Sequence, residues 1–350
     1  MEPRIAIVGT GAIGGYCGAH FARAGKDVTL IDGWPEHVET MRAQGLRITG
    51  MTPAECFTTP VRALHLCDVP QFVREKPFDV AFVSVKSYDT EWATRLIAPY
   101  LAPDGFVVSL QNCINEECVA SVVGWQKTMG CIVSVLGAEL VEAGQVLRTT
   151  PLGDAGHPGM RVGEVHGRIT PRARMVADLM GLCEASMVTH NLWGERWTKL
   201  VINSMRNGLS ACTGMSGKQR DLTESTRWIG IRLASQAIRV AQALGYSLES
   251  VAGMDPERLA RAGEGDRDAL PPVVDRMIEI ISARSDEQRP SMGQDIRTGR
   301  RTETDFINGF VHERGKEIGV AAPLHGKINE LVKRVECGEA KASPELVAGL

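Results

Sequence analysis

The feature that most constrains this sequence is a short apolar run followed by a glycine-rich turn near the N-terminus. The run 5–8 is rich in β-branched residues and too short for a helix, so it predicts a buried parallel strand. Gly9, Gly11 and Gly14 follow as G-x-G-x-x-G, and residues 12–24 are expected to form a helix. The first glycine permits a tight turn, the second lets a pyrophosphate approach the backbone, and the third lets helix and strand pack closely. The stretch therefore predicts a dinucleotide site, against the alternative of glycines used for packing alone.

The turn and the strand after it supply the expected cofactor contacts. Backbone N–H groups and the positive end of the helix dipole favour binding of the phosphates. We assign these phosphate contacts to Gly9, Thr10, Gly11, Ala12, Ile13 and Gly14. A second strand over 27–32 ends in Asp32, eighteen residues after Gly14. An acid at this place accepts hydrogen bonds from ribose hydroxyls and repels a 2′-phosphate, and residues 33–37 hold no Lys or Arg to bind one. The sequence therefore favours NAD as the cofactor over NADP.

Bulk properties exclude several classes of protein. A chain of 350 residues is long enough for two domains. A net charge of −3 gives no electrostatic footprint for nucleic acid or an anionic membrane. The nine cysteines form no Cys-x-x-Cys pair, which favours reduced thiols in a cytoplasmic protein and no metal site. We expect neither a signal peptide nor a membrane span. The expected partner is a small-molecule substrate, with no nucleic-acid or membrane partner, and a homodimer is one candidate assembly.

Strands and helices alternate in the first half of the chain. Further strands are expected at 78–86, 105–112, 130–140, 146–150 and 160–164, helices at 36–44, 89–101 and 115–123, and irregular or β structure at 46–70. This alternation predicts a doubly wound sheet, in which ligands bind beyond the carboxyl ends of the strands. Lys86 and Asn112 stand at two such ends.

Helical patterns dominate from about residue 171 onward. They cover 171–185, 191–212, 223–245, 271–284, 291–318 and 324–336, with an exposed charged loop at 261–268 and a link near 186–190. The predicted fold is therefore α/β, with an N-terminal Rossmann doubly wound sheet over residues 1–188. A C-terminal all-helical domain is expected over residues 189–350.

A polar stripe marks the first helix of the second domain. Lys199, Asn203 and Asn207 are spaced four residues apart, so they would share one helix face. One amine and two amides could bind a carboxylate, a hydroxyl and a carbonyl. The alternative is a solvated helix face. Two asparagines are a poor choice for such a face, because asparagine is a mediocre helix former.

A later segment places a carboxylate on an apolar stripe. Ile296, Glu303 and Phe310 are seven residues apart within the helix expected over 291–318. A buried carboxylate is costly unless it is paired, so Glu303 is a candidate for an ion pair with a lysine or for proton chemistry. Ser291 is a ligand candidate, although Ser291 with Gln294 also fits a capping box.

Together these stretches resemble the ketopantoate reductase (2-dehydropantoate 2-reductase) family over most of the chain. The specific parts are the glycine turn, the strand end at Lys86, Gln111-Asn112, the Lys199–Asn207 stripe, and residues 291–297 with Thr302-Glu303. The resemblance implies a Rossmann domain followed by a helical domain, with the active site in the cleft between them. It implies reduction of 2-dehydropantoate to pantoate, a step of pantothenate biosynthesis.

The resemblance also implies roles for individual residues. Lys199 would be the general acid, and Glu303 would hold and tune it. Asn203, Asn207 and Ser291 would bind the hydroxyl and carboxylate end of the substrate. The remaining two, Lys86 and Asn112, would contact the cofactor and the reacting region, so Asn112 serves both cofactor and substrate.

Three features depart from the family pattern. Typical members use NADPH and carry a basic residue where this chain has Asp32. Cys113 stands where the family usually has glycine, and the stretch 246–290 is longer than expected. A catabolic NAD-dependent dehydrogenase of another bulky 2-hydroxy acid or alcohol is therefore the alternative enzyme. A non-catalytic NAD-binding regulator is disfavoured, because it would need neither Lys199 nor Glu303.

Overall fold

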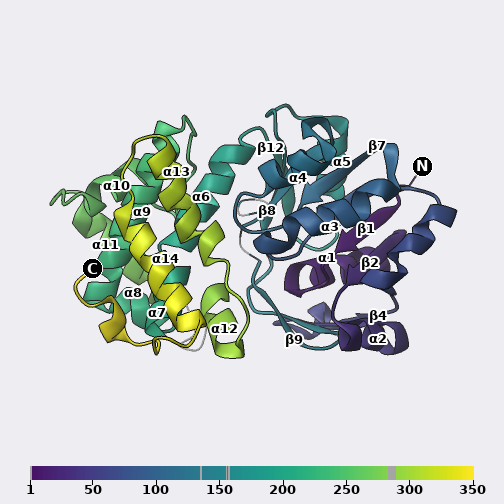
Figure 1. The fold of residues 1–350 in the computed structure, drawn as a ribbon, viewed down its shortest axis with the longest axis horizontal. Coiled ribbons are helices and arrows are strands. Elements are labelled where there is room, and N and C mark those ends of the chain that lie inside the picture. The colour runs from purple at the N-terminus through teal and green to yellow at the C-terminus, as the bar shows by residue number, and fades with distance from the viewer. Residues whose placement is uncertain (1, 135, 155, 157, 283–288) are drawn as a thin grey trace. The chain divides into compact units, whose positions relative to one another are not determined.

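The chain divides into two compact units, Met1–Leu192 and Trp193–Leu350 (Figure 1). The structure is a computed structural model that describes residues 2–134, 136–154, 156, 158–282 and 289–350. Two predicted elements run into the remaining positions: the strand at 130–140 includes residue 135, and the helix at 271–284 ends beyond residue 282. Each unit is described by itself below.

The first unit is built on an eight-stranded sheet. Its strands are β1 Ile5–Val8, β2 Val28–Asp32, β5 Arg62–His65, β6 Phe78–Val83, β7 Leu101–Ser109, β8 Thr128–Val133, β11 Met160–Glu164 and β12 Ser186–Thr189. Their order across the sheet is β12-β11-β8-β7-β6-β1-β2-β5. From β8 to β5 all neighbours pair in parallel, whereas β8 and β11 pair antiparallel. The carboxyl ends of β1, β6 and β7 therefore meet at one edge of the sheet.

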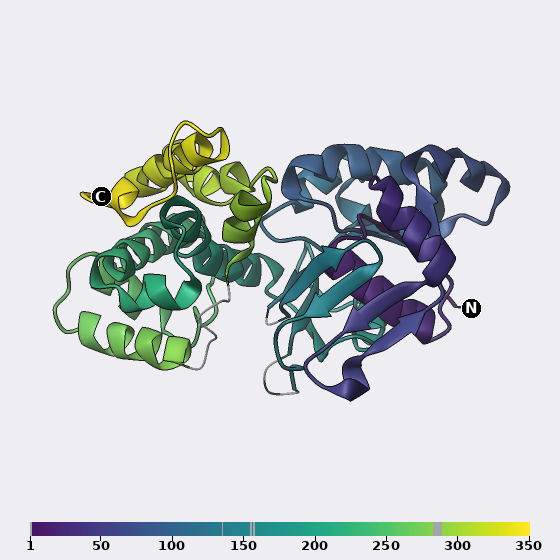
Figure 2. The same ribbon diagram turned by 90° about the horizontal axis from the view of Figure 1, so that it is seen from below.

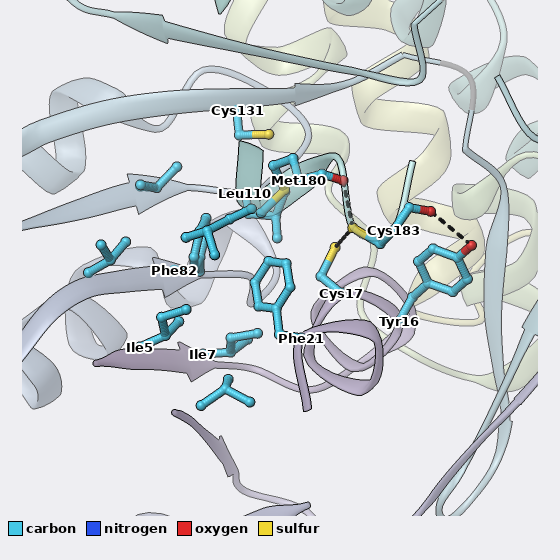
Figure 3. Close-up of a cluster of buried hydrophobic side chains, with 14 of the residues drawn as sticks. Ile5, Ile7, Tyr16, Cys17, Phe21, Phe82, Leu110, Cys131, Met180 and Cys183 are labelled. Carbon is cyan, nitrogen blue, oxygen red and sulfur yellow. Dashed lines mark hydrogen bonds between the residues drawn. The ribbon is translucent and has the colours of Figure 1, made fainter. Parts of the chain in front are cut away.

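Helices cover both faces of this sheet. They are α1 Ala12–Arg23, α2 Pro35–Gln44, α3 Thr90–Ile97, α4 Glu116–Val123 and α5 Pro171–Met180. Because side chains alternate along a strand, Ile5 and Ile7 join a core cluster with residues of α1 and α5, as Figure 3 shows for Phe21 and Met180. Ala6 joins the opposite cluster, with residues of α3 and α4. This two-sided burial explains the continuous apolar runs of the sequence.

A second sheet packs on α1 and was not anticipated from the sequence. Its strands are β3 Leu46–Thr49, β4 Phe57–Thr59, β9 Ala138–Glu142 and β10 Gln145–Arg148, in the order β4-β3-β10-β9. The parallel pairing of β3 with β10 joins segments about a hundred residues apart. Leu46, Ile48 and Val146 belong to the same core cluster as Ile5 and residues of α1, so α1 packs against both sheets (Figures 1 and 2).

The expected link near 186–190 is instead the edge strand β12, which pairs in parallel with β11. The preceding helix α5 packs on β11 and β12 and belongs to the first unit. The helices of the second unit therefore begin with α6 at Leu192, and the helical pattern from residue 171 is that of α5 in the first unit. A four-residue edge strand with a half-exposed pattern carries too weak a period to be recognised in the sequence.

The second unit is helical, which confirms the predicted fold class. Its helices are α6 Leu192–Ser204, α7 Asn207–Thr213, α8 Gly217–Leu222, α9 Glu224–Ala243, α10 Pro256–Gly263, α11 Leu270–Ser282, α12 Ser291–Thr298, α13 Asn308–Glu317 and α14 Pro323–Glu336. The twenty-residue α9 packs against α10, α13 and α14. Among the described residues, no helix in either unit combines the length and apolar character that a membrane crossing needs.

Two predicted helices are interrupted, and two others were missed. The helix expected over 291–318 ends at Thr298, because Gly299 adopts a left-handed conformation (φ +66°) that terminates α12. The helix expected over 191–212 breaks at residues 205–206 into α6 and α7. The short helices α8 and α10 were not predicted, and α10 takes up the first three residues of the expected loop at 261–268.

Candidate active site

The glycine turn of the first unit has a packing reason at two of its three glycines. Gly9 has φ +91°, and a Cβ there would lie 2.8 Å from the backbone nitrogen of Val85. A Cβ on Gly14 would lie 2.1 Å from the carbonyl oxygen of Gly9. A Cβ on Gly11 would meet nothing within 4 Å in the described structure. The first and third glycines therefore close the turn, while the second borders open space.

The start of α1 is suited to an anion. Gly11 is its N-cap residue, no side chain caps this end in the described structure, and the first turn contains no acid. The first N–H groups of a helix lack partners within the helix, and they carry the positive end of its dipole. These residues fit the pyrophosphate of a dinucleotide.

Asp32, at the end of β2, is tied to the glycine turn. Its Oδ2 accepts hydrogen bonds from the Thr10 backbone N–H at 2.7 Å and the Thr10 hydroxyl at 2.8 Å. Its Oδ1 accepts the backbone N–H of Trp34 at 2.9 Å. A carboxylate has about four acceptor positions, so these bonds leave room for about one more donor. Asp32 thus orders the turn and keeps an acceptor position for a further donor.

His37, which the sequence reasoning missed, supports the same turn from α2. The ring is fully buried, and its Nε2 lies 2.9 Å from the carbonyl oxygen of Thr10. Its Nδ1 accepts the backbone N–H of Gly144 at 2.8 Å, in the turn between β9 and β10. These partners require a neutral ring with the proton on Nε2. His37 therefore connects the glycine turn to the second sheet, and no pattern in the sequence signals this contact.

The ends of β6 and β7 are joined by side chains. Gln111 donates from Nε2 to the carbonyl oxygen of Val85 and to the Thr90 hydroxyl, both at 2.8 Å. Asn115 Nδ2 donates to the carbonyl oxygen of Asn112 at 2.8 Å. The segments that carry Lys86 and Asn112 are thereby fixed at the edge of the sheet that also holds the glycine turn, and both side chains are half-buried.

Cys113 keeps the backbone conformation of a glycine. Its φ is +65°, in the left-handed region that residues with a Cβ rarely adopt, and the side chain is buried. The departure from the family pattern therefore changes the residue type at this position and retains the backbone conformation that favours glycine.

In the second unit, the predicted polar stripe spans two helices. Lys199 and Asn203 lie four residues apart on α6, and Asn207 is the first residue of α7. Lys199 is half-buried, whereas Asn203 and Asn207 are 7% and 6% exposed. The Nδ2 atom of Asn203 is buried and has no acceptor among the described residues. A solvated helix face does not describe these two asparagines.

Ser291 approaches the stripe from α12. Asn207 Nδ2 donates to the Ser291 hydroxyl at 3.4 Å. The predicted capping box is wrong, because Pro290 is the N-cap residue of α12 and no side chain of the described residues caps it. The backbone N–H of Gln294 bonds to the carbonyl oxygen of Pro290 instead. Ser291 is therefore held beside a predicted ligand residue rather than serving as a helix cap.

Glu303 does not lie on a helix stripe, which corrects the predicted spacing with Ile296 and Phe310. It lies between α12 and α13, just before a short 3-10 turn over Thr304–Phe306, and is 5% exposed. Its carbonyl oxygen accepts the N–H groups of Phe306 and Ile307, both at 3.0 Å. The second unit contains both Lys199 and Glu303, and their pairing stays a prediction.

The junction between α6 and α7 is held by a buried arginine that the sequence did not single out. Arg220 donates to the carbonyl oxygen of Arg206 at 3.1 Å and to the Ser210 hydroxyl at 2.9 Å. Asp221 pairs with the Arg220 guanidinium at 2.7 Å. The start of α7, and with it Asn207, is fixed by these bonds.

No group of three or more potential metal ligands occurs among the residues that the structure describes.

Comparison with known protein families gives matches to both units. The model of the family "Ketopantoate reductase PanE/ApbA" matches residues 5–155. The model "Ketopantoate reductase PanE/ApbA C terminal" matches residues 191–336. Together the two matches cover most of the chain and every residue of the candidate site.

Individual proteins agree with the family models. A 2-dehydropantoate 2-reductase from Archaeoglobus fulgidus is 29% identical over 343 residues, which is 96% of this chain and 98% of that protein. A PanE/ApbA family ketopantoate reductase from Ralstonia eutropha JMP134 has a TM-score of 0.77 at 26% identity, covering 96% of this chain and 99% of that one. A D-mandelate dehydrogenase, solved with NADH and anilino(oxo)acetate, has the same fold, with a TM-score of 0.79 at 22% identity over 96% of this chain and 98% of that one.

Proposed function

Because the chain belongs to the ketopantoate reductase family, an oxidoreductase family, we propose that it reduces a branched 2-oxo acid, in the first place 2-dehydropantoate to pantoate. The observation that carries the proposal is the buried polar set of the second unit. Asn207 contacts Ser291, and the buried Nδ2 of Asn203 has no acceptor among the described residues. An amide buried without a partner is costly, so we expect a substrate oxygen to be its acceptor.

The proposed chemistry follows from the side chains of this set. Addition of hydride to a 2-oxo acid turns the keto oxygen into a developing alkoxide, which a proton-donating cation stabilises. Lys199 donates that proton from Nζ. Glu303 favours the charged amine against the desolvation that opposes it. Asn203, Asn207 and Ser291 bind the hydroxyl and carboxylate end of the substrate.

The first unit carries the proposed cofactor contacts. A nicotinamide dinucleotide supplies the hydride when bound. The open space at Gly11 and the uncapped start of α1 fit its pyrophosphate. Asp32 has room for one ribose hydroxyl and opposes a 2′-phosphate, so we propose NADH as the preferred reductant. Lys86 and Asn112 lie at neighbouring strand ends, where they contact the cofactor and the reacting region.

The test is a panel of 2-oxo acids assayed with NADH and NADPH by absorbance. The panel includes 2-dehydropantoate and the 2-oxo acid that corresponds to mandelate. We expect the highest kcat/KM for 2-dehydropantoate with NADH. A higher value for an aromatic or other bulky 2-oxo acid would replace the proposed substrate while leaving the reaction type intact.

Binding without turnover would overturn the proposed reaction. Titration calorimetry with NADH measures cofactor binding independently of activity. Tight NADH binding with no turnover of any panel member would favour the regulator hypothesis.

A homodimer stays a prediction, which sedimentation of the full chain tests.

A further inference from the structure

We infer that the last two turns of α14 position Glu303, and that Glu336 is the principal positioning residue. This inference rests on the proposed function, because it concerns the carboxylate proposed to tune Lys199. Glu303 lies outside any helix. Its placement therefore depends on what holds the segment 302–307, and the structure shows contacts to α14 on both sides of it.

On the N-terminal side, Glu336 holds Thr302. The Oε2 atom of Glu336 accepts the Thr302 backbone N–H at 2.9 Å and the Thr302 hydroxyl at 2.5 Å. Both donors belong to the residue that precedes Glu303, and Thr302 is only 4% exposed. Hydrogen bonds to an ionised acceptor are about twice as strong as neutral ones. The carboxylate therefore fixes the backbone on which Glu303 begins.

On the C-terminal side, Asp305 is held by the same helix. Its Oδ1 lies 2.6 Å from Lys333 Nζ and accepts a hydrogen bond from Asn329 Nδ2 at 3.1 Å. Burial raises the pKa of Asp305, but the hydrogen bonds from Lys333 and Asn329 and the nearby positive charges together outweigh burial and leave the pKa lowered. Asp305 is thus ionised and paired at neutral pH.

The three α14 residues share one helix face. Asn329, Lys333 and Glu336 follow the spacing i, i+4 and i+7, which places them on one side of a helix. They contact the residues at positions −1 and +2 relative to Glu303. A rigid helix that binds the residues on both sides of Glu303 restricts the position of Glu303 more than the segment could by itself.

The contacts are poor candidates for a purely stabilising role. Lys333 and Asp305 are exposed, and exposed ion pairs contribute little to the free energy of unfolding. Glu336 is an exposed residue whose two hydrogen bonds among the described residues both reach Thr302. Removing Glu336 should therefore leave the unit folded. Because an error of about 1 Å in a catalytic group can cost about a hundredfold in rate, the same change should be visible in the kinetics.

The experiment compares Glu336→Ala with Glu336→Gln and with Glu330→Ala, an exposed control on the same helix. We expect Glu336→Ala to lower kcat about tenfold, a fraction of the loss from a 1 Å misplacement because Asp305 still holds the other flank. The KM for NADH should not change. Glu336→Gln keeps an acceptor for Thr302 and should recover most of the rate, and Glu330→Ala should match wild type.

The pH profile separates positioning from general damage. With Glu303 displaced, the Lys199 ammonium loses a nearby opposite charge, so the basic limb of the kcat profile should move to lower pH by on the order of one unit. Glu303→Gln should move it in the same direction. Adding Glu336→Ala to Glu303→Gln should then cost little more, because both changes act on one carboxylate.

The outcomes distinguish the inference from the proposed function. If Glu303→Gln impairs turnover and Glu336→Ala does not, the positioning inference is wrong and the proposed function stands. If neither Glu303→Gln nor Lys199→Ala impairs turnover, the proposed catalytic roles fail first. Hydrogen exchange at the Thr302 and Ile307 amides gives a readout without substrate: unchanged exchange in Glu336→Ala would also overturn the inference.

Discussion

At the scale of one residue, the structural role of Asp32 must be separated from its proposed role in cofactor preference before that preference can be tested. Its carboxylate orders Thr10 and Trp34 and is also proposed to contact a ribose hydroxyl. Asp32→Arg would leave the backbone N–H groups of Thr10 and Trp34 without this acceptor. Each such N–H group lowers the free energy of unfolding by about 1–3 kcal/mol where it is buried. A change in cofactor preference in that variant would be mixed with a loss of folded protein.

Gly33→Arg tests the preference without breaking these bonds. Gly33 is exposed, and among the described residues a Cβ there would meet only the flexible side chain of Leu66, at 3.3 Å. We expect wild type to prefer NADH, and the new cation to raise kcat/KM for NADPH while the melting temperature stays near wild type. Asp32→Arg is the comparison, with a similar gain and a lower melting temperature. A wild-type enzyme that prefers NADPH would contradict the proposal.

Lys199 is the residue on which the proposed chemistry depends most. If its amine protonates the developing alkoxide, Lys199→Ala should lower kcat by about 10²–10⁴-fold, the usual contribution of general acid catalysis. NADH affinity should change little, because the cofactor contacts lie in the first unit. Single-turnover kinetics with 2-dehydropantoate measure the chemical step directly. Near-full turnover in the variant would return Lys199 to an ordinary helix residue.

Cys113 gives a prediction about backbone strain. A left-handed conformation costs a residue with a Cβ about 1–2 kcal/mol, whereas glycine avoids that cost but loses about 0.5–1 kcal/mol through the entropy of the unfolded chain. Cys113→Gly should therefore be more stable than Cys113→Ala, which keeps the Cβ at φ +65°. Urea unfolding of the two variants measures the difference. Equal stability, or a more stable alanine variant, would mean that the strain is relieved elsewhere.

At the scale of elements, a buried arginine fastens the second sheet to α1. Arg148 on β10 is 1% exposed, pairs with Glu184, and donates to the Tyr16 hydroxyl at 2.8 Å and the Thr150 carbonyl oxygen at 2.7 Å. Removing one partner of such a pair leaves a buried charge uncompensated. The position of β10 on α1 therefore depends on a charge network as well as on apolar packing.

Arg148→Met should destabilise the first unit by about 3–5 kcal/mol, because Glu184 would remain buried without its ion-pair partner. Adding Glu184→Gln should recover part of the loss, since the amide keeps an acceptor for the Gly153 N–H. Arg95→Met, at an exposed i,i+4 pair with Glu91, is the control and should cost less than about 1 kcal/mol. Urea unfolding measures all three. A loss as small as the control would show that Glu184 finds other partners.

Which elements the sequence could predict depends on the range of the contacts that define them. Strands such as β1 and β6 are buried on both faces, so local composition identifies them. The pairing of β3 with β10 depends on a partner about a hundred residues away, and no local pattern encodes it. The left-handed Gly299 ends α12 after Thr298, whereas the apolar spacing through Glu303 by itself predicts a continuous helix.

The candidate site shows the same division. Glycine spacing and the strand ends predict that the turn, Lys86 and Asn112 lie at one edge of the sheet, because strand carboxyl ends meet in a parallel sheet. The Asn207–Ser291 contact joins α7 to α12 and needed the tertiary structure. His37, Arg220 and Glu336 act through backbone groups of other residues. Such support leaves no motif, because any donor or acceptor in the right place could serve.

At the scale of the whole molecule, each unit contains a histidine whose pKa is lowered by folding, so acid should lower the free energy of unfolding of both units. In the second unit, burial lowers the pKa of His325 from 6.5 to about 4. Its Nε2 lies 2.9 Å from the Leu233 carbonyl oxygen, and its Nδ1 lies 3.1 Å from the Asn308 amide nitrogen, which fits a neutral ring. In the first unit, burial likewise lowers the pKa of His20 to about 4.

The sign of the pH effect follows from proton binding. The unfolded chain protonates these histidines near their ordinary pKa of 6.5, while the folded units resist until about pH 4. The unfolded state therefore binds more protons between these values, so stability is full above about pH 6.5 and falls as the pH drops toward 4. A shift of this size corresponds to about 3 kcal/mol for the fully buried His325. His20 is partly exposed, so its contribution should be smaller.

Urea unfolding at a series of pH values between 7.5 and 4.5 measures this loss. Wild type should show a falling free energy of unfolding, and His325→Asn should start less stable but show a shallower dependence on pH. His190→Gln, at an exposed histidine, is the control and should keep the wild-type slope. The two units can unfold separately, so hydrogen exchange assigns each loss to its unit. If His325→Asn kept the full wild-type slope while exchange in the second unit still accelerated with acid, groups other than His325 would be the source of the acid sensitivity.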